Sequence, residues 1–134
     1  MNQNIFHYIK KLTKQSEQLG FVYTKNEDLI SQLKSEIVEV EEVINDPNKK
    51  SELEEEVGDM LLASINLCSF LKLDPKETLA KSVQKYQRRL EKVEKLVKKA
   101  GLENLKNQPR EVLMKFWKQA KAETKINHYL SLKH

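Results

Sequence analysis

The sequence is poor in the residues that break or cross-link a chain. Of its 134 residues, only three are glycine, three are proline and one, Cys68, is cysteine. Scarce glycine and proline disfavour a turn-rich β fold and favour helices. A lone cysteine excludes an intramolecular disulfide and fits a reducing compartment. Because Cys68 lies in the most apolar segment, we expect it to be a small buried hydrophobe rather than a reactive thiol.

Long apolar runs are also missing. The longest, around residues 60–71, is interrupted and too short to span a bilayer. Residues 1–15 lack the apolar segment of a signal peptide. These absences predict a cytoplasmic protein with no membrane partner. The length is enough for one domain with a real core, so we expect residues 1–134 to form a single domain.

Charge, in contrast, is abundant and unevenly distributed. The formal net charge is +4, but residues 36–59 carry ten acidic and two basic side chains, and residues 75–100 carry nine basic and three acidic ones. An acidic centre followed by a basic helix suits a metal ion on one wall of a site and phosphate on the other. Nucleic acid is a poorer partner, because the acidic segment repels a phosphate backbone.

Two acidic pairs are the most informative motifs. Glu36 and Glu39 lie three residues apart, as do Glu56 and Asp59, with sixteen residues between the pairs. Residues three apart on a helix share a face. A turn at residues 46–48 would let two helices fold back antiparallel. The sequence therefore predicts four carboxylates around one point, which we call the acidic cluster.

Four negative charges so close together need a partner that neutralises them. Hard divalent cations prefer oxygen ligands, and Mg²⁺ is commonly shared between carboxylates and substrate phosphates. We therefore predict a Mg²⁺ site, with Mn²⁺ as a possible substitute, acting on a phosphate-bearing substrate. The plain alternative is a solvated glutamate-rich face. Against it, Glu36 falls inside the apolar stripe of its helix, where a carboxylate needs a partner or a metal. Glu39 lies just past the edge of that stripe.

Start and stop signals predict five helices. Gly20 and Gly101 have the placement of glycines that end helices, and Asp74-Pro75 is typical of a helix start. Capping boxes at Thr24-x-x-Glu27 and Ser51-x-x-Glu54 would open two further helices. The expected helices span about residues 2–18, 25–45, 51–72, 75–100 and 109–122.

This pattern, with no visible β segment, predicts an all-α fold: a helical bundle of about five helices with a four-helix core. The third helix is apolar almost all round, so it should be buried on several sides. A small monomer cannot cover such a helix. We therefore expect a homodimer or tetramer to complete the bundle, and residues 125–134 to form a weakly patterned tail.

Two pairs of residues on the later helices are candidates for substrate contacts. Lys85 and Arg89 border the apolar stripe of the fourth helix and could reach phosphate oxygens. The alternative is a solvated edge whose side chains snorkel along the stripe. On the fifth helix, Trp117 and Lys121 lie four apart. Trp117 is either ordinary core or a platform that stacks on a base beside a phosphate-reaching Lys121.

In this order, the motifs resemble the MazG-type nucleoside triphosphate pyrophosphohydrolases, which are all-α enzymes of the dimeric dUTPase-like group. Their E-x-x-E and E-x-x-D signature stands here as Glu36-Ile-Val-Glu39 and Glu56-Val-Gly-Asp59. The later K-x-x-R-R-x-x-x-V-E pattern appears as KYQRRLEKVE, and W-x-x-x-K appears in FWKQAKAE. The resemblance covers about residues 19–124 and is greatest to the C-terminal domain of two-domain bacterial MazG proteins.

The resemblance implies Mg²⁺-dependent hydrolysis of NTPs or dNTPs between the α and β phosphates, giving a nucleoside monophosphate and pyrophosphate. It assigns the acidic cluster to metal binding and, through metal-bound water, to catalysis. It suggests Lys85 and Arg89 for phosphate contacts, and Trp117 and Lys121 for nucleotide contacts. Ser35 departs from the family, since relatives often carry a further Glu there. Two alternatives stay open: a phosphoribosyl-ATP pyrophosphohydrolase-like enzyme, and a non-catalytic regulatory or interaction protein on the same fold.

Overall fold

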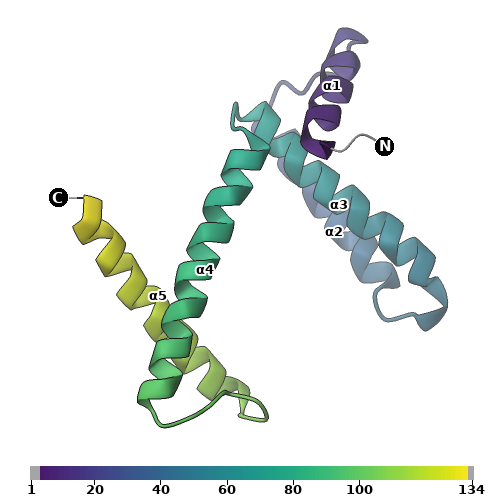
Figure 1. Ribbon diagram of the computed structural model, residues 1–134. Helices are drawn as coiled ribbons and strands as arrows, with labels where there is room; N and C mark the ends of the chain where they lie inside the picture. The colour runs from purple at the N-terminus through teal and green to yellow at the C-terminus, as the bar shows by residue number, and fades with distance from the viewer. Residues whose placement is uncertain (1–3, 133–134) are drawn as a thin grey trace. The chain divides into compact units, whose positions relative to one another are not determined.

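The computed structural model describes residues 4–132, with the side chains of residues 126–131 outside the description. Its elements are α1 (Ile5–Gln18), α2 (Asn26–Val43), the 3₁₀ helix η1 (Pro47–Lys49), α3 (Lys50–Phe70), α4 (Pro75–Lys99) and α5 (Arg110–Leu132) (Figure 1). Residues 4–132 contain no β-strand, which confirms the predicted all-α class. Contacts within the chain divide it into two compact units, Met1–Thr78 and Leu79–His134.

Three helices end in the same hydrogen-bonded motif with a left-handed residue. Gly20 (φ 105°) ends α1 and Gly101 (φ 78°) ends α4, which confirms both predicted stops. At the end of α3 the left-handed residue is Lys72 (φ 62°), and the next amide, of Leu73, donates to the Cys68 carbonyl at 2.9 Å. A lysine adopts this conformation less readily than glycine does, because its Cβ is crowded there.

Both predicted capping boxes are wrong. Helix α2 begins at Asn26, so its N-cap is Lys25, which makes no side-chain cap hydrogen bond. Helix α3 begins at Lys50 directly after η1, which places Ser51 inside the helix. The capping group lies further upstream, where the Asp46 side chain accepts the Asn48 N–H at 2.9 Å and starts η1. Acidic residues in the first turn of α2 still favour its N-terminus through the helix dipole.

The start of α4 is as predicted, whereas α5 is longer. The Asp74 carboxylate accepts the Glu77 N–H at 3.0 Å, and Pro75 is the first helical residue. Helix α5 continues past the expected end near residue 122 as far as Leu132. The reason is that no glycine or proline follows Pro109. Most of the expected tail is therefore helical, and residues 133–134 lie outside the described residues.

In the first unit, α2 and α3 run back antiparallel and pack closely, as the turn at residues 46–48 predicts (Figure 1). The core is small: among the residues described in this unit, only Leu29 and Val43 of α2 and Ala63 of α3 are buried. The single chain does not cover α3 on several sides, which agrees with the expectation that a monomer cannot do so, and its burial in an oligomer stays a prediction. Leu61 is 57% exposed, and Cys68 is half-buried rather than buried.

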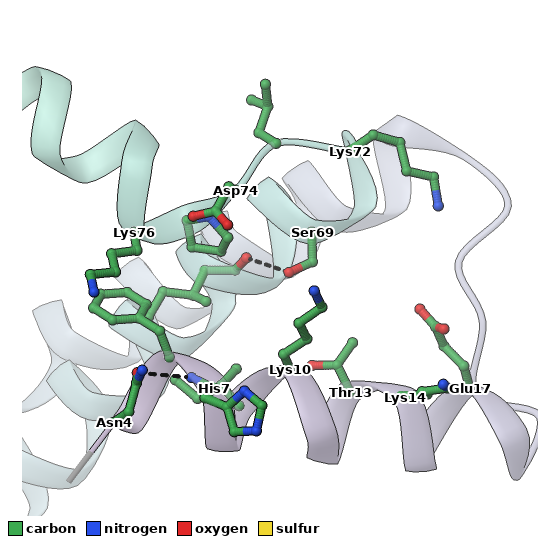
Figure 2. Close-up of a pocket in the computed structure, with 15 residues that line it drawn as sticks. Asn4, His7, Lys10, Thr13, Lys14, Glu17, Ser69, Lys72, Asp74 and Lys76 are labelled. Atoms are coloured by element: carbon green, nitrogen blue, oxygen red, sulfur yellow. Dashed lines mark hydrogen bonds between the residues drawn. The ribbon is translucent and has the colours of Figure 1, made fainter.

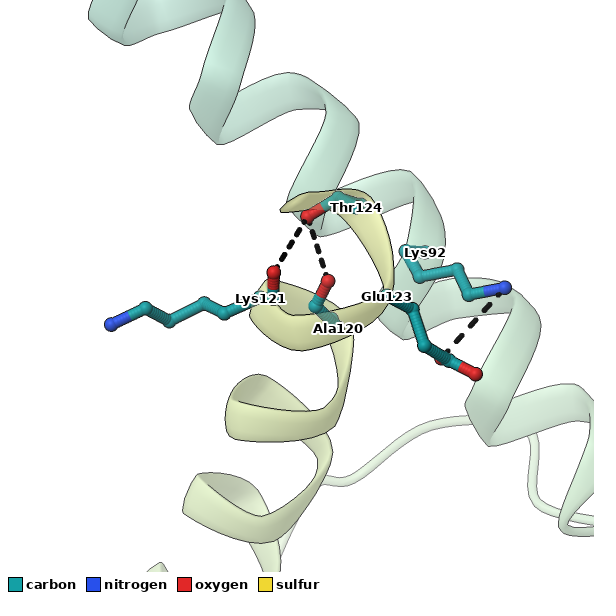
Figure 3. Close-up of polar contacts among 5 residues, drawn as sticks. All are labelled: Lys92, Ala120, Lys121, Glu123 and Thr124. Carbon is teal, nitrogen blue, oxygen red and sulfur yellow. Dashed lines mark hydrogen bonds and ion pairs between the residues drawn. The ribbon is translucent and has the colours of Figure 1, made fainter. Parts of the chain in front are cut away.

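In the second unit, the core between α4 and α5 is built from Leu96, Val97 and the fully buried Ala120. The Lys92 Nζ atom lies 3.8 Å from Glu123 Oε2 (Figure 3). Among the described residues, no helix of either unit combines the length and apolarity that crossing a membrane requires.

Candidate metal and nucleotide site

The antiparallel pairing of α2 with α3 gathers carboxylates that are distant in the sequence. One carboxylate oxygen from each of Glu36, Glu56 and Asp59 lies within 4.8 Å of the other two. Glu36 comes from α2, and the other two residues come from α3. Glu36 and Glu56 are half-buried, whereas Asp59 is exposed. The site thus opens to solvent on the Asp59 side.

Glu39 completes the acidic cluster from its edge. Its side chain is exposed and stands outside the tight group of three. It is nevertheless close enough to hydrogen-bond with both Glu36 and Glu56 and to repel their charges. The structure therefore brings together all four carboxylates that the sequence singles out.

The proximity of these groups disfavours their charged forms. Protonated Glu56 donates a hydrogen bond to Glu39, and this bond, partial burial and the charges of Glu39, Asp59 and Glu36 raise the pKa of Glu56 to about 7. The pKa of Glu36 is also raised, first by burial and then by the charges of Glu39 and Asp59. Without a cation, the cluster holds back protons that isolated glutamates would release.

The oxygens of this cluster suit a hard divalent ion. Glu36 Oε2 and Glu56 Oε2 are buried and have no hydrogen-bond partner. A buried acceptor without a donor is costly, and a cation between the two residues would satisfy both. An all-oxygen donor set is what Mg²⁺, Mn²⁺ and Ca²⁺ prefer. An oxygen without a hydrogen-bond partner is weaker evidence by itself, since Glu123 Oε2 also lacks one and lies 3.8 Å from the Lys92 Nζ atom.

The residues suggested for phosphate and nucleotide contacts all belong to the second unit. On α4, Lys85 is exposed and Arg89 is half-buried. On α5, Trp117 is half-buried, and its ring centroid lies 5.9 Å from that of Tyr86 with the planes tilted by 51°. This contact fits the reading of Trp117 as part of the packing, and its nucleotide role stays a prediction.

Lys121 is exposed on α5, and its side chain points away from the Lys92–Glu123 pair (Figure 3). Its backbone carbonyl accepts a hydrogen bond from the Thr124 hydroxyl at 3.2 Å. The side-chain ammonium of Lys121 takes no part in that bond. The three histidines are far apart in the sequence and belong to none of the motifs above. His7 is exposed, and the side chains of His128 and His134 lie outside the described residues.

The structure also shows lysines that sequence reasoning missed. Lys10, Lys14, Lys72 and Lys76 line one cavity in the first unit. The available signal was the spacing of Lys10 and Lys14, four apart on α1, with Lys72 at the predicted end of the third helix and Lys76 at the predicted start of the fourth. Nothing in the sequence placed the two groups side by side, because they are far apart along the chain.

The fold and the cluster define a class of protein: an all-α chain in which two antiparallel helices bring four carboxylates to one point. Comparison with known families identifies it further. Residues 24–94 match the model of the MazG nucleotide pyrophosphohydrolase domain. The chain belongs to this family. The matched segment contains the whole acidic cluster together with Lys85 and Arg89, and ends before Trp117 and Lys121.

Curated relatives carry the same family name or activity. The chain is 36% identical over 112 residues to the nucleoside triphosphate pyrophosphohydrolase/pyrophosphatase MazG of Thermotoga maritima, an alignment covering 84% of this chain and 42% of the relative. It is 31% identical over 115 residues to the nucleoside triphosphate pyrophosphohydrolase of Escherichia coli K12, covering 85% and 43%. The chain thus spans less than half the length of these two relatives.

Proposed function

We propose that this chain hydrolyses nucleoside triphosphates to a nucleoside monophosphate and pyrophosphate with the help of Mg²⁺ bound at the acidic cluster. The observation that carries the proposal is the convergence of carboxylates from α2 and α3, with two buried oxygens that lack a partner. Family membership supports it, as do the names of the Thermotoga maritima and Escherichia coli relatives.

The proposed metal ligands are Glu36, Glu56 and Asp59, with Glu39 completing the site from its edge. Bound there, the ion would supply positive charge that offsets the carboxylates and polarises the substrate phosphate. Mn²⁺ is expected to substitute, because it accepts the same oxygen donors. Glu39 is proposed to bind and orient the metal ion from the solvent side. Its side chain is exposed, yet it lies within reach of both half-buried glutamates.

In the proposed reaction, water attacks the α-phosphorus and the bond to the oxygen bridging the α and β phosphates breaks. Lys85 and Arg89 are proposed to neutralise negative charge on the leaving pyrophosphate. The family match spans both residues and supports this role. Trp117 and Lys121 are proposed to contact the nucleotide. Their support is the resemblance of FWKQAKAE to the W-x-x-x-K motif.

We further propose that copies of this chain associate into a homodimer or tetramer in the cytoplasm. Large apolar side chains of α2, of its C-cap residue and of α3 are exposed in the single chain, which supports association. These residues are Ile30, Ile37, Val38, Ile44, Leu61 and Leu62. Analytical ultracentrifugation across a concentration range tests the proposal, and a monomer at all concentrations would contradict it.

The activity is tested with a panel of NTPs, dNTPs and phosphoribosyl-ATP in Mg²⁺, Mn²⁺ or EDTA. Pyrophosphate and nucleoside monophosphate should appear in equal amounts, and EDTA should abolish their release. In ¹⁸O-labelled water, the label should enter the monophosphate, because the attack is at the α-phosphorus. Release of orthophosphate alone would contradict the proposal, and strong preference for phosphoribosyl-ATP would favour that alternative.

A further inference from the structure

The lysine-lined cavity of the first unit is separate from the acidic cluster. It has a volume of about 670 Å³ and opens between α1 and the junction of α3 with α4 (Figure 2). Its walls include Lys10 and Thr13 on one side and Ser69 and Lys72 on the other. No residue of the acidic cluster lines it. Its chemistry must therefore be explained separately from the metal site.

The charged groups around this cavity favour an anion. Four lysines line it against two carboxylates, those of Glu17 and Asp74. One of these carboxylates is already engaged, because Asp74 caps α4 through the Glu77 N–H. Among the described residues no ion pair joins any of the four lysines to a carboxylate. The four lysines, which we call the lysine set, are Lys10, Lys14, Lys72 and Lys76.

Two members of the lysine set project from different walls of the cavity. In Figure 2, Lys10 extends from α1 toward Ser69, and Lys72 extends from the loop after α3 on the side where Glu17 lies. Lys72 does so from a left-handed backbone conformation, which glycine would adopt with less strain. This conformation belongs to the hydrogen-bonded end of α3 and fixes the point at which the Lys72 side chain leaves the backbone.

Five of the nine uncharged lining residues are apolar, and this narrows the class of ligand. The apolar lining residues are Phe6, Ile9, Ile65, Leu73 and Pro75. The hydroxyl of Ser69 and the side chains of His7 and Thr13 add polar contacts. A bare inorganic ion would leave the apolar wall unused. A ligand with both an anionic and an apolar part would use the whole surface, and the volume is in the usual range for small-molecule sites.

We propose that this cavity binds a nucleoside phosphate without a metal ion. The lysine set binds the phosphate oxygens, for which lysine is a common partner. The base lies against Phe6 and Ile9 on the apolar side of the cavity. The proposal does not rest on the pyrophosphohydrolase activity, because no group is shared with the acidic cluster. It adds a second nucleotide site on the opposite end of α3 from Glu56.

The test measures ATP binding by titration calorimetry in EDTA, where the metal site is disabled. ATP should bind, and inorganic pyrophosphate should bind more weakly because it lacks the base. In the variant Lys10→Gln/Lys72→Gln, the affinity for ATP should fall by at least about tenfold. The matched control Lys11→Gln/Lys50→Gln removes the same charge from exposed positions that do not line the cavity, and it should bind as the natural protein does.

Two outcomes would overturn the proposal: no ATP binding in EDTA, or an equal loss of affinity in the control variant. Glu56→Gln distinguishes the two sites, since it should leave this binding unchanged while abolishing turnover in Mg²⁺. If the lysine variant unfolds, amide chemical shifts of the natural protein decide instead. ATP in EDTA should shift Lys10, Thr13 and Ser69, and a map without these residues would contradict the proposal.

Discussion

The two helix pairs, α2 with α3 and α4 with α5, differ in how their charged side chains are arranged. The first gathers like charges, with the pKa of Glu56 raised to about 7 by Glu39, partial burial and the neighbouring charges. The second combines the ion pair Lys92–Glu123 with the tilted aromatic contact between Tyr86 and Trp117. Both pairs have small cores, so packing alone does not explain the difference. Carboxylates that repel one another do not stabilise the first pair when no cation is bound, which is consistent with the proposed metal site. The second pair is arranged as ordinary helix packing is.

The largest expected effect is on activity, from breaking the charge arrangement of the first pair. Glu56→Gln or Asp59→Asn should lower turnover of NTPs by roughly 100-fold or more, because a lost ligand removes several kcal/mol of charge stabilisation in the transition state. Pyrophosphate release measures the loss. The matched control is Glu41→Gln, an exposed glutamate of α2 outside the cluster. Comparable losses in control and cluster variants would refute the assignment.

The second-largest effect is expected on the free energy of unfolding, from a substitution in the core of the second helix pair. Leu96 is 9% exposed in the core between α4 and α5, so Leu96→Ala should lower the free energy of unfolding by about 2–3 kcal/mol. Urea denaturation followed by circular dichroism measures it. Leu79, on the same helix, is 53% exposed, and Leu79→Ala should cost clearly less. Equal costs at the two positions would show that the α4–α5 core is not as described.

The third effect is a pH dependence that belongs to the acidic cluster. The pKa of Glu56 is about 7 in the folded protein, raised from 4.5 by the hydrogen bond to Glu39, burial and nearby charges. Between these values the folded state binds more protons than the unfolded state, so metal-free stability should fall as pH rises from about 4.5 to about 7. Thermal melts in EDTA measure this fall.

Glu56→Gln should flatten that profile, because the side chain no longer titrates. Mg²⁺ should raise the melting temperature more at pH 8 than at pH 5, since a cation competes with protons for the carboxylates. Stability that rises through this pH range in EDTA would contradict the arrangement of the first helix pair.

The smallest effect is expected at the ion pair of the second unit. The Lys92 and Glu123 side chains are 28% and 39% exposed, and their charged atoms are 3.8 Å apart. Solvent screens such a pair, so Lys92→Met should change the free energy of unfolding by at most about 1 kcal/mol. Denaturation at low and high salt provides the measurement. A much larger cost that does not change with salt would mean that the Lys92–Glu123 ion pair stabilises the second unit substantially. The charges of the first helix pair do not stabilise that pair in this way.

Much of the local structure could be predicted from the residues alone. Gly20 and Gly101 end helices in positive φ, and Asp74 caps α4 as its position before Pro75 predicts. The spacing of Glu36 and Glu39 indicated one helix face. The capping boxes misled, because a serine or threonine followed by glutamate also fits inside or just before a helix. Local signals compete, and η1 moved the start of α3 upstream of Ser51.

By itself, then, the sequence determined the all-α class, most helix boundaries and the identity of the four carboxylates, because these depend on residues within a turn or two of one another. Only the tertiary structure decided that Glu36, Glu56 and Asp59 form the tight group while Glu39 remains at its edge. It alone placed Lys10 across a cavity from Lys72. The physical reason is that burial, repulsion and pKa depend on distances through space, which helix packing sets and which spacing along the chain does not.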